Sequence, residues 1–86
     1  MPYLAVSTNT GDGSSLFGAE GARMAELQSE GTVEHLWLKA DWSGAVLVLS
    51  SADEQQARTA LDSLPITRAG LTTWALTAVA VPPPPH

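Results

Sequence analysis

The sequence contains no cysteine, and that absence excludes several classes of protein at once. Disulfide-stabilised scaffolds, thiolate metal sites and cysteine nucleophiles all need a side chain that this chain lacks. Basic residues are also scarce, since four Lys and Arg stand against nine Asp and Glu and give a formal net charge of −5. Nucleic acids and anionic membrane surfaces bind clustered Lys and Arg, so we expect neither as a partner.

Long hydrophobic runs are missing as well. No apolar run approaches the about 20 residues needed to span a bilayer, and no leader segment precedes the first predicted strand, so we expect a cytoplasmic protein. The 86 residues suffice for a single domain, expected over residues 1–81, with a stiff proline-rich tail at residues 82–86. A domain this small buries only about 60–65% of its unfolded surface, so we expect a partner chain to complete its core.

Hydrophobic periodicity predicts four strands and two helices. The strands are expected at residues 3–8, 32–40, 45–50 and 71–81, and the helices at residues 15–30 and from residue 51 onward. Gly31 is the expected C-terminal cap of the first helix, Ser51 and Glu54 form a capping box for the second, and Pro65 ends it. The order β-α-β-β-α-β with right-handed crossovers predicts a ferredoxin-like α+β fold, with both helices on one face of a four-stranded antiparallel sheet.

The middle hairpin is apolar on both of its faces when Ala40 is paired with Ala45 across residues 41–44. One face carries Leu36, Leu38, Ala40, Ala45, Leu47 and Leu49, which suits the two helices. The other face carries His35, Trp37, Lys39, Val46, Val48 and Ser50. A sheet that is apolar on both faces is expected to be covered on both.

A second copy of the chain is the simplest cover for the second face. Two such sheets packed face to face predict a barrel-like homodimer with a pocket between them. By alternation we expect Tyr3, Ala5 and Ser7 to line this pocket from the first strand, and Thr73, Ala75 and Thr77 from the last. Trp74 and Leu76 are then expected to lie under the helices.

His35 is the only internal histidine and lies on the predicted pocket face. Histidine is the commonest general acid or base near neutral pH, although a strand histidine satisfied by Ser50 or the backbone is the alternative. Lys39 lies about 13 Å further along the same strand at about 3.3 Å per residue. It would hold a carboxylate or stabilise an enolate, or else extend into solvent. With His86 as the only other histidine, no metal site is expected.

Three aromatic side chains and one carboxylate complete the candidates. Trp37 is expected to pack against a ligand or the dimer seam, or simply to fill the core. Trp42, in the hairpin turn, would cap the pocket or contact a partner. Tyr3 would offer its hydroxyl to the pocket or serve only in packing, and Glu26 near the end of the first helix is either a catalytic carboxylate or a solvated one.

Residues 27–37, with the sequence LQSEGTVEHLW, closely resemble the helix-to-strand passage of muconolactone isomerase. Leu-Gln, Glu-Gly-Thr and His-Leu-Trp recur in the same spacing, and residues 63–66 look like the end of that family's second helix. The likeness extends from Met24 to the C-terminus. It implies a dimeric α+β barrel that can assemble further into a higher homo-oligomer, and a cofactor-free isomerase that moves a proton to shift a double bond in an unsaturated lactone. His35 and Trp37 match the motif, and Glu26 occupies a helix position where the family is rich in acids.

The chain departs from the family at Lys39, Trp42 and Ser50, which have no obvious counterparts, so the substrate stays open. We expect a cofactor-free isomerase or cyclase that acts on a small unsaturated lactone or polyketide-like molecule, with His35 as proton shuttle. The expected catalytic residues are His35, Lys39 and Glu26. The expected substrate-binding residues are Tyr3, Ser7, Trp37, Trp42, Val46, Val48, Ser50, Thr73 and Ala75. The alternatives are a non-catalytic small-molecule-binding or accessory protein and a cofactor-independent monooxygenase.

Overall fold

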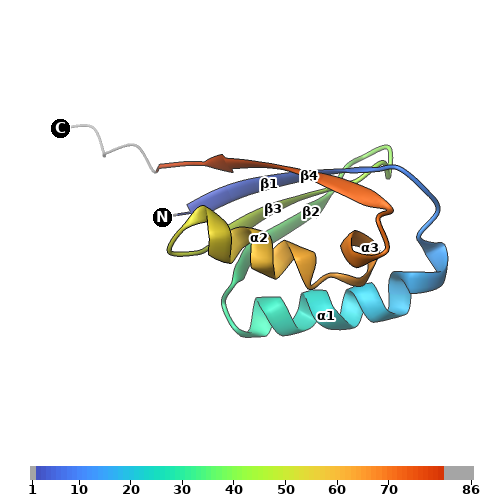
Figure 1. The fold of residues 1–86 in the computed structure, drawn as a ribbon, viewed down its shortest axis with the longest axis horizontal. Helices are drawn as coiled ribbons and strands as arrows, with labels where there is room; N and C mark the ends of the chain where they lie inside the picture. Colours follow the sequence, from blue (N-terminus) through green and yellow to red (C-terminus); the bar gives the residue numbers. More distant parts are fainter. Residues whose placement is uncertain (1, 81–86) are drawn as a thin grey trace.

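The computed structural model describes residues 2–80, which form one antiparallel sheet with helices packed on one side (Figure 1). The elements in chain order are β1 (Pro2–Asn9), the 3₁₀ turn η1 (Ser14–Leu16), α1 (Phe17–Ser29), β2 (Val33–Leu38), β3 (Ala45–Ser50), α2 (Glu54–Asp62), α3 (Pro65–Arg68) and β4 (Thr72–Ala78). The strand order β2-β3-β1-β4 confirms the predicted ferredoxin-like α+β fold. The predicted proline-rich tail lies outside the described residues.

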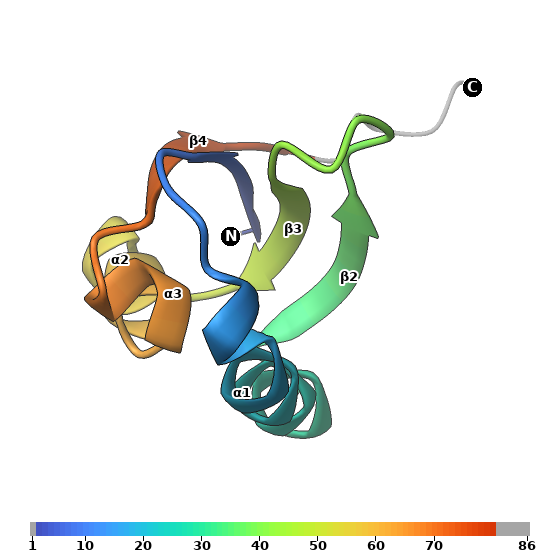
Figure 2. The same cartoon turned by 90° about the vertical axis from the view of Figure 1, so that its right-hand side faces the viewer.

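The sheet curls around the helix layer, as the end-on view shows (Figure 2). α1 packs beside β2, whereas α2 and α3 pack beside β4, so the two edges of the sheet are covered by different helices. Between residues 2 and 80 no helix combines the length and the apolar character that crossing a membrane requires.

The end of α1 is a Schellman motif, in agreement with the predicted glycine cap. Gly31 has a φ of 81°, a left-handed conformation that glycine adopts without steric cost. The amide of Thr32 donates to the carbonyl of Leu27 at 3.0 Å, and the amide of Gly31 donates to the carbonyl of Gln28 at 3.1 Å. These two bonds satisfy carbonyls at the helix end and turn the chain into β2.

The N-cap of α2 lies two residues after the predicted one, Ser51. Asp53 is the N-cap, and its Oδ1 accepts from the amide of Gln56 at 2.9 Å. The Gln56 side chain answers by accepting from the amide of Ala52 at 2.9 Å. The predicted cap by Ser51 and Glu54 was therefore wrong, because Asp53 and Gln56, with the same spacing two residues later, bond to the first turn instead.

Pro65 does more than end the second helix. It occupies the first turn of the short helix α3, where its missing N–H and fixed φ are tolerated. The predicted irregular connection after Pro65 is therefore helical as far as Arg68. Gly70, with a φ of 74°, then redirects the chain into β4.

The β2–β3 register differs from the prediction by two residues. Leu38, rather than Ala40, pairs with Ala45, because the amide of Lys39 donates to the carbonyl of Gly44 at 3.0 Å and closes the loop earlier. A shift by an even number leaves every side chain on its predicted face. Val33 pairs with Leu49 and His35 pairs with Val48, the next residue of β3. Glu34 is therefore left without a partner in β3 and forms a bulge in β2.

The facing of β1 was predicted incorrectly. Ala5 pairs with Leu47 and shares its helix-covered face, as do the two positions on either side, Tyr3 and Ser7. Ser7 is only 3% exposed. Strand alternation fixes which residues share a face but not which face is buried, and β1 carries small and apolar residues on both.

The core lies between the sheet and the helices, while the opposite face of the sheet is open. The buried apolar side chains are Ala5, Met24, Leu27, Val33, Leu47, Leu49, Ala57, Leu61 and Leu64. On the open face lie Leu4, Val6, Val46, Val48 and Trp37, together with the predicted Thr73, Ala75 and Thr77. Trp37 is 53% exposed, so this face is apolar and uncovered in the single chain.

Candidate functional site

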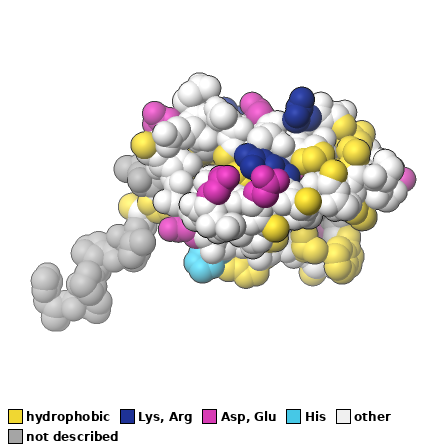
Figure 3. All heavy atoms as spheres, turned by 90° about the horizontal axis from the view of Figure 1, so that it is seen from below, with side chains coloured by type: hydrophobic (Ala, Val, Ile, Leu, Met, Phe, Trp, Pro, Cys, Tyr) yellow, Lys and Arg dark blue, Asp and Glu magenta, His cyan; other side chains and the backbone are white. Residues whose placement is uncertain are grey.

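A cavity of about 350 Å³ lies between the sheet and the helices, at the end where the β2–β3 loop meets the start of α1. Its volume falls in the range of small-molecule sites, roughly 300–1,000 Å³. Every layer of the fold contributes to the lining, which consists of Ser7, Asn9, Phe17, Glu20, Gly21, Met24, Leu36, Leu38, Trp42, Gly44, Ala45, Ile66, Thr72 and Trp74. From the helix side, hydrophobic side chains gather toward this end of the molecule (Figure 3).

Hydrogen bonds hold the polar lining residues in place. The hydroxyl of Ser7 accepts from the amide of Ala45 at 2.7 Å. Thr72 Oγ1 donates to the carbonyl of Thr8 at 3.1 Å. The indole N–H of Trp74 donates to Thr67 Oγ1 at 2.8 Å, which fixes the orientation of that ring. The walls are thus apolar and ordered, with a few hydroxyl groups at defined positions.

Glu20 brings a carboxylate into this cavity from the first turn of α1. Its Oε1 accepts from the amide of Ile66 at 3.0 Å, a contact that ties α1 to α3. Glu20 is the only titratable side chain among the described residues that line the cavity, and none of them is Lys or Arg. The cavity therefore offers a proton acceptor without a positive charge beside it.

Exposed aromatic side chains form the mouth of the cavity. Trp42 is 75% exposed and Phe17 is 64% exposed, although both line the cavity. Large apolar side chains that are exposed together carry a hydration cost, and such patches are typical of ligand-binding grooves and protein interaction sites.

The β2–β3 loop holds Trp42 in an unusual backbone conformation. Its φ of 63° is left-handed, which costs a non-glycine residue free energy. The amide of Trp42 donates to the carbonyl of Lys39 at 2.9 Å. Asp41 Oδ1 accepts from the hydroxyl of Ser43 at 2.7 Å and from its amide at 3.0 Å, and these bonds lower the pKa of the Asp41 carboxyl. The loop is thus built to keep the indole at the mouth.

The structure places the predicted catalytic residues away from this cavity. His35 and Trp37 lie on the open face with their rings stacked, 5.3 Å apart and 14° from parallel. Lys39 Nζ donates to Thr8 Oγ1 at 3.4 Å. Glu26 is exposed on α1 and pairs with Arg23 at 3.5 Å, so the sheet separates it from His35.

The predicted substrate-binding residues divide between the two faces of the sheet. Ser7 and Trp42 line the cavity, and Tyr3 packs against the core on the same side. The remaining predicted residues, Trp37, Val46, Val48, Thr73 and Ala75, lie on the open face. Ser50 ends β3 and borders a second, more open groove.

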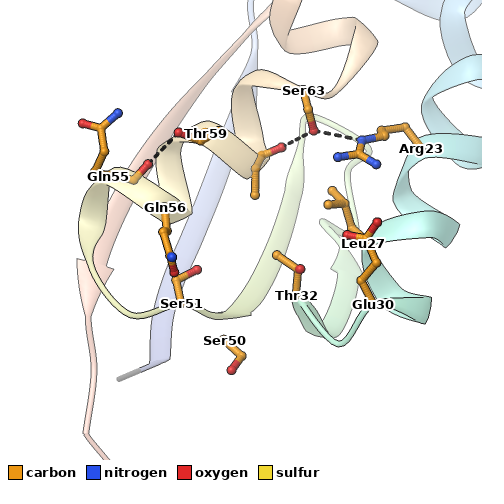
Figure 4. Close-up of a pocket in the computed structure, with 11 residues that line it drawn as sticks. Arg23, Leu27, Glu30, Thr32, Ser50, Ser51, Gln55, Gln56, Thr59 and Ser63 are labelled. Carbon is orange, nitrogen blue, oxygen red and sulfur yellow. Dashed lines mark hydrogen bonds between the residues drawn. The ribbon is translucent and has the colours of Figure 1, made fainter.

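That second groove is polar and lies between α1 and α2 (Figure 4). Its volume is about 430 Å³. Arg23 Nε donates to Ser63 Oγ at 3.0 Å, and Ser63 Oγ donates to the carbonyl of Ala60 at 2.6 Å. Arg23 and Ser63 are engaged with each other, and the groove is more open than the cavity, so it is the weaker candidate for ligand binding.

Sequence analysis did not identify Glu20 and Phe17 as site residues, although their spacing along α1 indicates a shared face. They precede Met24 by four and seven residues, so all three lie on one stripe of α1. A carboxylate on the apolar stripe of an amphipathic helix faces the interior rather than water. That pattern alone marks Glu20 as unusual.

Comparison with models of known protein families and with curated proteins finds no match for this chain. Among solved structures, the chain is similar to 5-chloro-2-hydroxyhydroquinone dehydrochlorinase from Burkholderia phenoliruptrix AC1100, in complex with 2,5-dihydroxybenzoquinone. The TM-score is 0.72 at 18% sequence identity, and the likeness covers 93% of this chain and 94% of that chain. The likeness shows a shared α+β fold over nearly the whole chain.

Proposed function

We propose that this protein is an enzyme that transfers protons within a small, unsaturated, oxygen-bearing ring compound, as an isomerase or a cyclase. The carrying observation is the apolar cavity of about 350 Å³ that contains one carboxylate and a few oriented hydroxyl groups. Such a reaction rearranges the substrate without an added reactant, and its chemical needs are a proton carrier and a place shielded from water.

The lining favours an uncharged substrate. An anionic compound would meet the carboxylate of Glu20, and no Lys or Arg among the described lining residues would balance the charge. A flat unsaturated ring would instead contact the indole of Trp42 and the aliphatic walls. The hydroxyl of Ser7 bonds only weakly to the carbonyl of Ala45, at 3.5 Å, so its proton is available to a substrate oxygen.

Two similarities support this proposal. Residues 27–37 resemble muconolactone isomerase, a family that shifts double bonds in lactones, and the fold is shared with a dehydrochlorinase whose solved complex contains a quinone. Both compounds are small oxygenated rings. A positioned acid or base contributes about 10²–10⁴-fold, and orientation in the cavity would supply further acceleration.

The test uses α-angelica lactone, an uncharged unsaturated lactone, in deuterated water. Wild-type protein is expected to catalyse deuterium incorporation and double-bond migration, followed by NMR. Trp42→Ala should weaken lactone binding by about tenfold, because a stacked aromatic contact is worth about 0.5–1.5 kcal/mol beyond the area it buries. Ligand-observed NMR measures this binding. A wild-type protein that neither binds nor exchanges this lactone would overturn the proposal.

His35→Ala decides between the cavity and a pocket on the open face. His35 lies on the far side of the sheet from the cavity, so the variant should keep its exchange rate if the cavity is the site. A loss of exchange in a folded His35→Ala protein would move the chemistry to the open face, where His35 was predicted to act.

A non-catalytic ligand-binding role is the second candidate. It is favoured by the single titratable group among the described lining residues, since many acid–base sites use a pair. Saturable lactone binding without deuterium incorporation would identify it. Oxygen consumption in the same mixture would instead identify an oxygenase.

We also propose that a second copy of the chain covers the open face of the sheet. Leu4, Val6, Val46 and Val48 form an aliphatic centre beside Trp37, and the ionisable groups His35 and Lys39 lie on β2 and at its end, at the edge of the sheet. Identical copies can therefore meet there with little charge repulsion.

Sedimentation velocity tests the dimer. Wild-type protein should sediment as a dimer, and Trp37→Asp should shift it toward monomer. Thr59→Asp, on the exposed side of α2, is the matched control and should change nothing. A wild-type protein that stays monomeric at high micromolar concentration would contradict the proposed interface.

A further inference from the structure

We infer that Glu20 is the catalytic residue that carries the proton in the cavity, an inference that rests on the proposed function. Three features lead to it: the carboxylate lines the cavity, one of its oxygens is held, and the other is unengaged. No motif in the sequence assigns Glu20 a role, because the family resemblance begins only at Met24.

The carboxylate is oriented from one side. Its Oε1 accepts from the amide of Ile66 at 3.0 Å, which fixes the plane of the group between α1 and α3. Its Oε2 has no hydrogen-bond or ion-pair partner within residues 2–80. A held carboxylate with one oxygen left for a ligand is the arrangement that a general base needs.

Five of the other carboxylates are engaged in structural contacts, and Glu30, Glu34 and Asp62 are exposed at the surface outside the cavity. Glu26 and Glu54 pair with arginines on their own helices. Asp12, Asp41 and Asp53 accept backbone amides in turns or at a helix start. Glu20 differs from all of these, because its bond reaches 46 residues along the chain and its surroundings are the apolar walls of the cavity.

The step that this geometry serves is a proton shift in a β,γ-unsaturated lactone. Glu20 takes a proton from the ring carbon beside the carbonyl, and the C–H electron pair forms a new double bond while charge passes to the carbonyl oxygen as a dienolate. The Glu20 carboxyl then returns the proton to the far carbon of the conjugated system. The double bond has moved, the carboxylate is restored, and no atom or electron is gained or lost.

The purely structural alternative is that Glu20 only accepts the N–H of Ile66. Glu20→Gln separates the two roles, because glutamine keeps the size and an acceptor oxygen but cannot carry a proton as a carboxylate does. Glu34→Gln, an exposed glutamate of β2 that lines neither the cavity nor the groove, is the matched control.

The experiment compares wild-type protein with Glu20→Gln and Glu34→Gln in the α-angelica lactone assay. We expect Glu20→Gln to slow deuterium incorporation by about 10²–10⁴-fold, while lactone affinity and the thermal midpoint stay unchanged. Glu34→Gln should match wild type. Added formate should restore part of the rate in Glu20→Ala, because a small carboxylate can occupy the vacated space. If Glu20 had only a structural role, formate would not restore the rate. The formate experiment therefore tests the role of Glu20 even if Glu20→Gln unfolds.

The outcomes separate this inference from the function on which it rests. A folded Glu20→Gln protein with a rate within about threefold of wild type overturns the role of Glu20 and leaves the proposed function standing. Failure of formate to restore any rate in Glu20→Ala also overturns the role. A wild-type protein that shows no exchange on this lactone overturns both the role of Glu20 and the proposed enzyme, and saturable binding without exchange then identifies the non-catalytic role.

Discussion

Gly44 occupies a position that no larger residue can take. A Cβ built there would overlap the carbonyl oxygen of Ser7 and lie 2.7 Å from its carbonyl carbon. Both atoms belong to the backbone of β1, so no side-chain rotation can relieve the clash. We therefore expect Gly44→Ala to push the start of β3 away from β1.

The magnitude follows from the hydrogen bonds at that point. The amide of Asn9 donates to the carbonyl of Ser43 at 2.7 Å, and the amide of Ala45 donates to Ser7 Oγ at 2.7 Å, so both bonds join β1 to the loop and to β3. Each net contribution is about 0.5–1.5 kcal/mol, so losing both costs about 1–3 kcal/mol. That is a large share of the roughly 5–15 kcal/mol that stabilises a typical domain.

Urea unfolding followed by circular dichroism measures this loss of free energy. In a separate thermal melt, the midpoint should fall by about 4–24 °C, since 1 kcal/mol shifts a domain of this size by about 4–8 °C. Gly18→Ala is the control, because a Cβ at this helical glycine meets nothing within 4 Å and alanine favours helix. If Gly44→Ala unfolded within about 0.5 kcal/mol of wild type, the close approach of β1 to the loop would be refuted.

Three further predictions concern single hydrogen-bonded groups. Ser7→Ala leaves the amide of Ala45 without its acceptor and should lower the free energy of unfolding by about 1–3 kcal/mol in urea titrations. Asp53→Ala removes the N-cap of α2 and should cost about 1 kcal/mol in the same assay. The pKa of Asp41 lies below the ordinary value of 3.8 because Ser43 donates to it, so its contribution persists above that value and is lost as the pH falls through the lowered pKa. The NMR signal of the Ser43 amide should therefore shift as the carboxyl is protonated, with a midpoint below pH 3.8.

Matched variants distinguish these effects from general disturbance. Thr10→Val removes an exposed hydroxyl bond and should change stability by less than about 0.5 kcal/mol, so an equal loss in Ser7→Ala would contradict the buried role. Asp62→Ala, in the last turn of α2, should be neutral or slightly stabilising, because a carboxylate opposes the dipole there. Asp41→Asn should abolish the acid shift; its persistence would assign the shift to another group.

The secondary structure could be read largely from the sequence because its signals are local. The β3 range of Ala45–Ser50 matches the prediction, and the glycine cap at Gly31 depends only on neighbouring backbone. The two faces of the hairpin were also predictable, since an error of two residues in register preserves alternation. The cap at Asp53 was missed because two overlapping patterns compete within four residues.

The facing of β1 required tertiary information. The residues on both faces of β1 are small or apolar. Composition therefore does not show whether the face with Tyr3, Ala5 and Ser7 is the buried one. Pairing with β3 and β4 decides the matter by placing Ala5 beside Leu47. The consequence is that Ser7 joins the cavity under the helices rather than the open face.

What the sequence by itself determined is the order of elements, the ferredoxin-like topology and an open sheet face that is apolar, because each follows from periodicity within short segments. Only the tertiary structure decided where the cavity lies and which residues share it with Glu20. Glu20 accepts from the amide of Ile66 because α1 packs against α3, and it lines the same cavity as Ser7 and Trp42. Residues so far apart along the chain come together only through the packing of whole elements, and no local sequence pattern specifies that packing.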